Sequence, residues 1–320
     1  MIILPLARTP SQDEMNQLES ILGQVTIARE NFEVRDQSPR TIEQALSDKI
    51  PSDLLKELPR SFGIVGDIAI LEFNPRLIPF QKIVATAIVA VHPNIRAVFA
   101  KAGAITGIER LRPLRHIAGE NRTRTTHKES GCVFSVDLSK AFFSPRLSTE
   151  RQRVANEVKE GERVLDMFAG VGPFSILIAK RLDHIEVDAI DSNPDATRLI
   201  EENAYLNKVQ SKLHIWTGDA RDIVPQHLEA RASRVIMNHP SESKDFIDVA
   251  CHALQHEGAM IHYYTFAEGE DCEGIARREF EDGLRAGGCE LDDIPVTRRV
   301  REVGPMKWQV AVEAKAAPRL

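Results

Sequence analysis

A short segment near the middle of the chain, residues 164–174, has the composition of a ligand-binding turn. It reads Val-Leu-Asp-Met-Phe-Ala-Gly-Val-Gly-Pro-Phe, which predicts a buried strand ending in Asp166, a tight turn with Gly170 and Gly172, and a following helix. Glycine lets the backbone approach a ligand closely, because it carries no side chain. A lone G-x-G is weak evidence, however, because any tight strand-to-helix turn can contain it.

Polar residues also follow the next three predicted strands. Asp191 ends the second strand, Asp219 follows the third, and Asn238-His-Pro240 follows the fourth. Asp191 lies about 20 residues beyond the glycine turn, where a carboxylate can accept both ribose hydroxyls of a bound nucleoside. Asp219 is placed to accept a hydrogen bond from an adenine amino group. Each residue alone is more often a turn or cap residue, but four polar strand ends in succession predict a nucleoside site.

Two nucleotide-binding alternatives lack essential residues. No Lys-Ser/Thr pair follows the glycines, which argues against a phosphate-transfer loop, and Ser175 occupies the third glycine position of the dinucleotide pattern. The spacing instead resembles that of class I methyltransferases, whose cofactor has no pyrophosphate and does not need the third glycine.

The predicted elements divide the chain into three parts. From residue 148 onward, short apolar runs alternate with amphipathic helical runs, which predicts a parallel sheet with crossover helices. Residues 59–143 mix strands (64–73, near 98, 132–138) with a helix (80–91), which is typical of a compact α+β module. Residues 1–58 contain helix starts at Ser11 and Thr41 and a short helix at 51–58. We therefore expect a small N-terminal module (1–58), an α+β region (59–143), to which the resemblance described below assigns RNA recognition, and an α/β, Rossmann-like class I methyltransferase domain (144–320).

Composition excludes several classes of protein. The 320 residues are 42% hydrophobic and 28% charged, which is ordinary for a globular protein. No apolar run is long enough to span a bilayer, and the first ten residues do not resemble a signal peptide. The 4 cysteines have no CxxC spacing, so we expect no metal site, no disulfide framework and a reduced, cytoplasmic setting.

A locally basic stretch contrasts with the net charge of −6. Between residues 96 and 129 only Glu109, Glu120 and Glu129 are acidic. Composition alone allows either a solvated basic surface or an RNA-facing patch. The basic residues of this stretch are Arg96, Lys101, Arg110, Arg112, Arg115, Arg122, Arg124 and Lys128.

Several motifs together resemble one family, the archaeal and eukaryotic tRNA (guanine-37-N1)-methyltransferases. The segment 166–176 is nearly a signature of that family, and the resemblance extends roughly from Ala45 to the C-terminus. The other matching segments are Phe-Ser-Pro-Arg-Leu-Ser-Thr-Glu-Arg (143–151), His-Ile-Ala-Gly-Glu-Asn-Arg (116–122), Ile-Met-Asn-His-Pro (236–240) and Ile-His-Tyr-Tyr (261–264).

The resemblance implies roles for particular residues. Arg110 is similar to the arginine that binds O6 of the target guanine, and Glu150 to the proposed general base. Asn238 and Pro240 resemble the N-x-P loop that holds the base. The resemblance also implies S-adenosyl-L-methionine as cofactor, tRNA (anticodon stem-loop and body) as partner, no membrane association and a monomer. The implied cofactor-binding residues are Arg151, Asp166, Phe168, Gly170, Asp191, Ser192, Asp219, Ala220 and Asn238.

The implied chemistry is physically reasonable. Guanine N1 carries a proton at neutral pH and is a poor nucleophile until a base such as Glu150 accepts that proton. A cation at O6 stabilises the negative charge that develops, and the guanidinium of Arg110 is always charged. The target base must leave its stack, which is easiest in a loop. Without the resemblance, Glu150 would be an N-terminal helix residue, Arg110 a surface charge and Asn238-Pro240 a turn.

Other functions stay open. Relatives also methylate a tricyclic wyosine precursor at position 37, and a paralogous family transfers an aminocarboxypropyl group; we expect that paralogue to lack Pro145-Arg146. A catalytically inactive RNA-binding module is disfavoured by the intact Glu150, Asp191 and Asn238. Enzymes that methylate amino or amide groups usually have an aromatic residue after the proline, whereas this chain has Ser241. The segment before Ala45 is shorter than in the family, and His239 and Phe142 depart from its usual Leu and Tyr.

Overall fold

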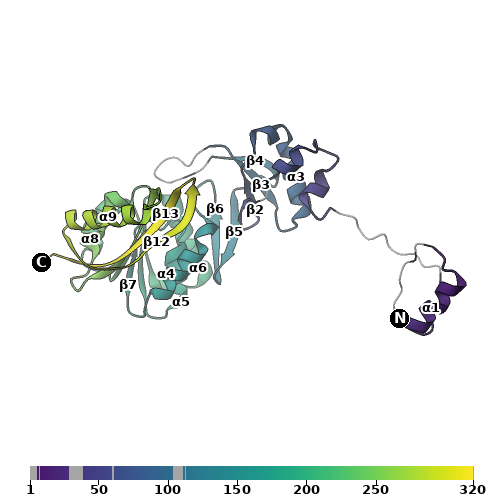
Figure 1. Cartoon of the computed structure of the whole chain (residues 1–320). Coiled ribbons are helices and arrows are strands. Elements are labelled where there is room, and N and C mark those ends of the chain that lie inside the picture. Colours follow the sequence, from purple (N-terminus) through teal and green to yellow (C-terminus); the bar gives the residue numbers. More distant parts are fainter. Residues whose placement is uncertain are drawn as a thin grey trace.

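The structure is a computed structural model that describes residues 6, 8–28, 39–59, 61–103, 111 and 113–319. The first described helix, α1 (Gln12–Leu22), begins at the predicted capping box, in which the Ser11 hydroxyl accepts from the Glu14 amide and the Glu14 carboxylate accepts from the Ser11 amide. None of its residues is buried, and Figure 1 shows it apart from the rest of the chain. The helix start at Thr41 is also confirmed, by α2 (Ile42–Leu46).

A four-stranded sheet and helix α3 (Gln81–Val91) form a compact N-terminal unit, drawn in blue in Figure 1. The strands lie in the order β1 (Gly63–Val65), β2 (Ile68–Leu71), β3 (Ala97–Lys101) and β4 (Leu114–Gly119). Two 3-10 helices, η1 (Leu54–Glu57) and η2 (Pro75–Phe80), precede α3. Leu46, Leu71, Leu77 and Ile88 are completely buried in its core.

The single strand predicted at residues 64–73 is wrong, because the chain turns back at Gly66 to form the β1–β2 hairpin. Gly66 has a φ of 56°, which favours glycine. A Cβ at this position would also lie 2.1 Å from the Thr125 hydroxyl. The turn therefore needs glycine both for its conformation and for its close approach to strand β5 (Arg124–Glu129).

A two-stranded hairpin, β5 (Arg124–Glu129) and β6 (Cys132–Asp137), packs on helix α6 (Pro194–Asn207). The carboxamides of Asn203 and Asn207 form hydrogen bonds with the backbone of Ser135 and Val133. Two buried side-chain amides therefore satisfy backbone groups of β6 that a further strand would otherwise bind. The hydrophobic core runs without a break from Phe99 of β3 through this hairpin into the C-terminal part.

A seven-stranded sheet dominates the C-terminal part, in the order β12-β13-β11-β10-β7-β8-β9. Its neighbours are parallel except that β13 is antiparallel to both β11 and β12. The strand order reverses beside β7, which is the place where open α/β sheets bind ligands. The strands are β7 (Arg163–Asp166), β8 (Glu186–Asp191), β9 (Leu213–Thr217), β10 (Arg234–Met237), β11 (Ala259–Glu268), β12 (Cys289–Gly304) and β13 (Lys307–Pro318).

Helices cover both faces of this sheet, as expected for buried parallel strands. Successive residues of one strand point to opposite faces, so Val164 packs in the core with α4 (Ser148–Glu157), α5 (Pro173–Arg181) and α6. Leu165 packs in the other core with α7 (Ala220–Ile223), α8 (Ile247–Ala253) and α9 (Cys272–Ala286). The remaining short helices are η3 (Pro145–Leu147), η4 (Gln210–Lys212), η5 (Val224–Leu228) and η6 (Ser243–Phe246). The predicted class I methyltransferase architecture, preceded by a smaller α+β region, is confirmed.

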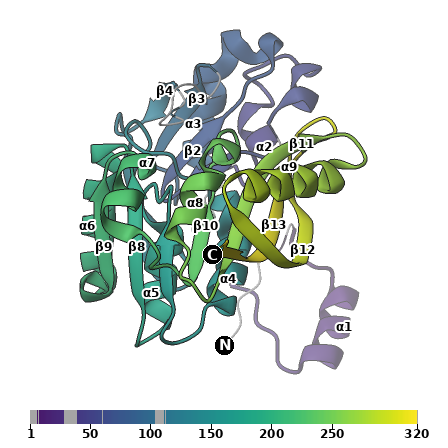
Figure 2. The ribbon, with the colours of Figure 1, turned by 90° about the vertical axis from the view of Figure 1, so that its left-hand side faces the viewer.

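The long β12–β13 hairpin is the main element that the sequence analysis did not predict. Figure 2 shows it at one edge of the sheet, opposite β9. Most residues of β12 are exposed or half-buried, so the strand lacks the continuous apolar run of the parallel strands. Among the described residues, no helix is both long and apolar enough to cross a membrane.

Candidate functional site

A cavity of about 210 Å³ lies at the carboxyl ends of β7, β8 and β10, beside the point where the strand order reverses. Loops from four strands and the segment before α4 form its wall. It brings together nine residues expected from the sequence: Arg151, Phe168, Gly170, Asp191, Ser192, Asp219, Ala220, Asn238 and Pro240.

The Asp191 carboxylate ties the glycine turn to the end of β8. Its Oδ2 accepts from the Gly170 amide at 2.7 Å and its Oδ1 from the Asn193 amide at 2.9 Å. Gly170 and Gly172 have φ values of 58° and 80°, so the turn uses conformations that favour glycine. The Asp191 carboxylate therefore orders the turn and also lines the cavity.

Asp219 also lines the cavity, where it caps α7. Its Oδ1 accepts from the Arg221 amide at 2.9 Å, and the Arg221 guanidinium binds the same carboxylate. This pairing lowers the pKa of Asp219. Arg221 also lies 4.8 Å from the centre of the Phe246 ring, and Phe246 makes an edge-on contact with Phe168. An acidic acceptor and an aromatic surface therefore face the same space.

Arg151 is a buried wall residue with its charge already compensated. Only 2% of its surface is exposed, and its Nε and Nη2 each donate to one oxygen of Glu129 at 2.7 Å. Nη2 also donates to the Ser144 carbonyl at 3.1 Å. This two-point ion pair fixes the β5–β6 hairpin against the start of α4, so the hairpin helps to shape the cavity.

Asp166 is the one predicted cofactor residue that does not line the cavity. It is completely buried at the end of β7, where its Oδ2 accepts from the Ser175 hydroxyl at 2.7 Å. Burial raises the pKa of Asp166 to about 7, and the nearby Asp191 charge adds to the effect. Ser175, at the position of the missing third glycine, thus anchors the base of the turn.

The raised pKa of Asp166 predicts a pH-dependent penalty on folding. The folded protein keeps the proton up to a pH of about 7, whereas an ordinary aspartate loses it near 3.8. Stability should therefore fall as the pH rises through this range. Asp166→Asn should gain about 2 to 3 kcal/mol relative to the wild type between pH 5 and pH 8, measured by urea unfolding. Asp183→Asn, at an exposed position, is the control; an equal change in both variants would contradict the assignment.

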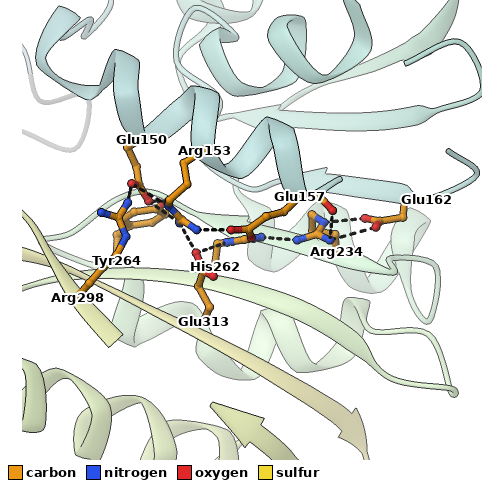
Figure 3. Close-up of polar contacts among 9 residues, drawn as sticks. All are labelled: Glu150, Arg153, Glu157, Glu162, Arg234, His262, Tyr264, Arg298 and Glu313. Atoms are coloured by element: carbon orange, nitrogen blue, oxygen red, sulfur yellow. Dashed lines mark hydrogen bonds and ion pairs between the residues drawn. The ribbon is translucent and has the colours of Figure 1, made fainter. Parts of the chain in front are cut away.

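Glu150 lies in the first turn of α4 but does not line the cavity. It is 3% exposed, and its carboxylate accepts from the Tyr264 hydroxyl at 2.7 Å and from Arg153 Nη2 at 2.8 Å. Arg298 of β12 forms a third contact with the same carboxylate. Figure 3 shows these side chains converging on Glu150 from three different elements. These donors stabilise the carboxylate anion and occupy both of its oxygens.

A buried polar network continues from Glu150 along the sheet (Figure 3). Arg153 pairs with Glu313, whose Oε1 lies 3.1 Å from His262 Nδ1, and His262 Nε2 lies 2.6 Å from Arg234 Nη1. An arginine can only donate, so Nε2 accepts and Nδ1 carries the proton. Although burial alone would raise it, the contacts with His262 and Arg153 hold the pKa of Glu313 at about 2.

The network also contains a set of metal-ligand types, Glu157, His262 and Glu313, whose ligand atoms lie within 4.8 Å of one another. Arg153 contacts both carboxylates, and Arg234 contacts the imidazole. Two guanidinium groups at this distance would repel a cation. The set is therefore an ion-pair network and not a metal centre.

Arg110 lies outside the described residues, so its predicted position at the base is not placed. The described part of the basic stretch is largely compensated by acidic neighbours. Arg122 pairs with Asp67 and Glu120, and Arg124 with Glu202. Arg96 and Lys101 are also in ion pairs. This region is less positive than its composition indicated.

Several residues of the cavity wall were not predicted. Arg221 comes from α7 and Phe246 from η6, and Arg301 and Gln309 come from the β12–β13 hairpin. The pattern Gly218-Asp-Ala-Arg221, with an aspartate at a helix start, is a local signal that could have identified Arg221. No comparable signal marks Gln309.

Comparisons with known proteins identify relatives of this chain. The model of the TRM5/TYW2 methyltransferase domain matches residues 125–291, and the model of the TYW2 N-terminal domain matches residues 42–123. A Pyrococcus abyssi protein named tRNA (guanine(37)-N(1))-methyltransferase Trm5b is 41% identical over 84% of this chain and 78% of its own length. A Saccharolobus solfataricus protein named tRNA 4-demethylwyosine(37)-methyltransferase Taw21 is 34% identical over 82% of this chain and 95% of its own length.

Solved structures share the fold over most of the chain. A complex of aTrm5 with tRNALeu has a TM-score of 0.76 at 30% identity, covering 96% of this chain and 87% of that one. Pyrococcus horikoshii TYW2 in complex with MeSAdo has a TM-score of 0.75 at 27% identity, covering 86% of this chain and 98% of that one. The fold, the cavity at the strand-order reversal and the matched length lead to one conclusion: the chain belongs to the TRM5/TYW2 methyltransferase family.

Proposed function

We propose that this protein transfers a methyl group from S-adenosyl-L-methionine to N1 of guanine 37 in tRNA. The observation that carries the proposal is the cavity at the end of β7, β8 and β10, where the glycine turn, Asp191, Asp219 and Asn238 meet. The name of the 41% identical Pyrococcus relative supports this substrate, and the relative's match extends over both parts of the chain.

The cavity wall fits the proposed cofactor. Asp191 would accept the ribose hydroxyls, because its carboxylate faces the cavity beside the glycine turn. Asp219 and Ala220 would hold the adenine edge, with Phe168 against the ring, and Ser192, Gly170 and Arg151 would complete the wall. When bound, the cofactor supplies a methyl group activated by its sulfonium. Asp166, buried beneath the turn, would support the site rather than contact the cofactor.

The target base would be handled by residues from both parts of the chain. Asn238 and Pro240 follow β10 and line the cavity, and the Pro240 carbonyl is fixed by the Phe266 amide at 3.2 Å. Glu150 would accept the N1 proton, and Arg110 would stabilise the charge on O6. For this step the Glu150 carboxylate must leave at least one of its donors, Tyr264, Arg153 or Arg298. Entry of the base would thus compete with Arg298 for the same oxygen.

A second candidate is methylation of a tricyclic wyosine precursor at position 37. The match to Taw21 along 95% of that protein favours it. Both substrates carry a purine-derived ring in the same loop, so one cavity can serve both reactions. Transfer of an aminocarboxypropyl group is disfavoured by the Pro145-Arg146 pattern.

We also propose a division of labour within the chain. Residues 144–320 would carry the chemistry, residues 59–143 would contact RNA, and residues 1–58 would form a separate small module. In this division the β5–β6 hairpin attaches the RNA-contacting part to residues 144–320, because Glu129 binds Arg151 while Asn203 and Asn207 bind the backbone of the hairpin.

Cofactor affinity provides the first test. Asp191→Asn should weaken S-adenosyl-L-methionine binding by about 10- to 100-fold, because it removes a charged acceptor. Isothermal titration calorimetry of the free protein measures this directly. Asp195→Asn, an acid in the first turn of the next helix that lies outside the cavity, is the matched control. Equal affinity in the two variants would remove Asp191 from the site.

The identity of the substrate is tested by product analysis. Transcripts with guanine or adenine at position 37, and tRNA carrying the tricyclic precursor, are incubated with protein and cofactor, then digested and analysed by mass spectrometry. The proposal expects 1-methylguanosine from the first transcript and no methylated nucleoside from the second. Methylation of the tricyclic substrate alone would replace the proposal with the second candidate.

A further inference from the structure

The β12–β13 hairpin places two polar side chains in the cavity wall, next to Asn238. Arg301 lies on β12 and Gln309 on β13, where the two residues are register partners. Gln309 is only 1% exposed, so its carboxamide is held among protein atoms. Neither residue belongs to the motifs at the ends of the parallel strands.

Two hydrogen bonds connect Arg301, Gln309 and Asn238, and in each the donor comes from the residue named first. Arg301 Nε donates to Gln309 Oε1 at 2.8 Å, and Gln309 Nε2 donates to Asn238 Oδ1 at 3.2 Å. A carboxamide can be turned either way, because its oxygen and nitrogen ends have the same shape. Arginine has no acceptor, however, so it fixes the oxygen end of Gln309 toward itself. The nitrogen end of Gln309 then fixes the oxygen end of Asn238.

These two hydrogen bonds define which end of the Asn238 carboxamide is available to a ligand. Because its oxygen is engaged by Gln309, its amino group is turned the other way, from a residue that lines the cavity. An amino group offers donors only. It therefore complements an acceptor such as the carbonyl oxygen of a guanine-type ring, and it opposes the amino group that adenine carries at the equivalent position.

We propose that Arg301 and Gln309 are positioning residues that set the orientation of the Asn238 carboxamide, so that its amino group faces a carbonyl oxygen of the target base. This inference rests on the proposed function, since it assumes a purine carbonyl in the cavity. It adds an arginine and a glutamine from the hairpin to the residues that select the base. A site built to donate to a carbonyl leaves its donor unpaired when a base without that carbonyl enters, which disfavours the wrong substrate.

Gln309→Glu tests the proposal with almost no change of shape. A glutamate at this position accepts from Arg301 and also from Asn238, so the Asn238 carboxamide should turn over and present its oxygen to the cavity. We expect kcat for guanine 37 to fall by about 10- to 100-fold, with the Kd for S-adenosyl-L-methionine within about twofold of the wild type. Gln210→Glu makes the same chemical change at an exposed position outside the cavity and should have no effect.

A double-mutant cycle separates positioning from a general structural effect. If Gln309 acts through Asn238, Gln309→Glu should have little further effect in an Asn238→Ala background, because no carboxamide remains to be turned. Equal losses in both backgrounds would overturn the proposal. So would a loss of cofactor affinity in step with kcat, because the carboxamide would then serve the cofactor and not the base.

Two replacements of Arg301 test whether a donor at this position is sufficient to retain turnover. Arg301→Lys keeps a group that can only donate, whereas Arg301→Met leaves Gln309 free to turn. The lysine variant should therefore retain several-fold more turnover than the methionine variant at equal thermal stability. Equal turnover in the two variants would contradict the proposal that Arg301 fixes the orientation of the Gln309 carboxamide. If wild-type protein forms no 1-methylguanosine in the same assay, the proposed function fails instead, so the two failures are distinguishable.

Discussion

Glu150→Gln is expected to bind S-adenosyl-L-methionine normally and to lose turnover on guanine 37 by about 10²- to 10⁴-fold, the usual contribution of a general base. Glutamine has the shape of glutamate and can still accept from the Tyr264 hydroxyl, but it cannot take the N1 proton. Calorimetry measures cofactor binding, and single-turnover methylation of a transcript measures the chemical step without product release.

The same change at Glu157 is the matched control for this prediction. Glu157 lies on the same helix and binds the same arginine, with its carboxylate 2.6 Å from Arg153 Nη1. Unlike the Glu150 side chain, which is 3% exposed, the side chain of Glu157 is 38% exposed. Glu157→Gln should therefore keep most of the turnover. A Glu150→Gln variant that also keeps it would exclude Glu150 as the base.

Glu313→Gln is expected to destabilise the fold by about 3 to 5 kcal/mol at neutral pH, because it removes the negative partner from a buried ion pair with Arg153. Glu313 is 2% exposed and pairs with both Arg153 and His262. Its pKa is about 2 in the folded protein against 4.5 for an ordinary glutamate. The stability that its charge provides is therefore complete above about pH 4.5 and is lost as the pH falls toward 2.

Urea unfolding at pH 7 and in acid tests this prediction. The deficit of Glu313→Gln should be largest at pH 7 and should shrink as the wild-type carboxylate becomes protonated. Glu290→Gln removes an exposed acid from the adjacent strand β12 and should change stability by less than about 0.5 kcal/mol. A constant deficit at every pH would show that packing, not charge, explains the loss.

The sequence predicted the residues that lie at the ends of parallel strands. Asp191, Asp219 and Asn238 follow short apolar runs, and the sheet brings such strand ends to one edge, so local pattern and topology agree. The turn glycines were predicted from the same pattern, whereas the hydrogen bond from Ser175 to Asp166 was not predicted. Asp166 was assigned to the cofactor site because it is next to the turn, although its side chain is buried beneath the cavity.

Other parts of the site depend on contacts between residues far apart in the chain. Arg301 and Gln309 come from an antiparallel hairpin. Its outer strand mixes charged and apolar residues without a regular period, so the sequence does not mark it as a strand. Two of the donors to Glu150, Tyr264 and Arg298, belong to β11 and β12, and Tyr264 is 114 residues away in sequence. No local pattern encodes these partners. Glu202, which pairs with Arg124 of the basic stretch, is a further partner that lies on a distant helix.

The proposed mechanism requires the Glu150 carboxylate to move from its pairing with Tyr264 and Arg298 to the target base. A solved structure of the protein with a tRNA and the demethylated cofactor measures the distance from the Glu150 carboxylate to guanine N1. We expect about 2.6 to 3.2 Å, with the contact to Arg298 broken. A complex with the guanine seated in the cavity and Glu150 still bound to Arg298 and Tyr264, out of reach of N1, would contradict the mechanism.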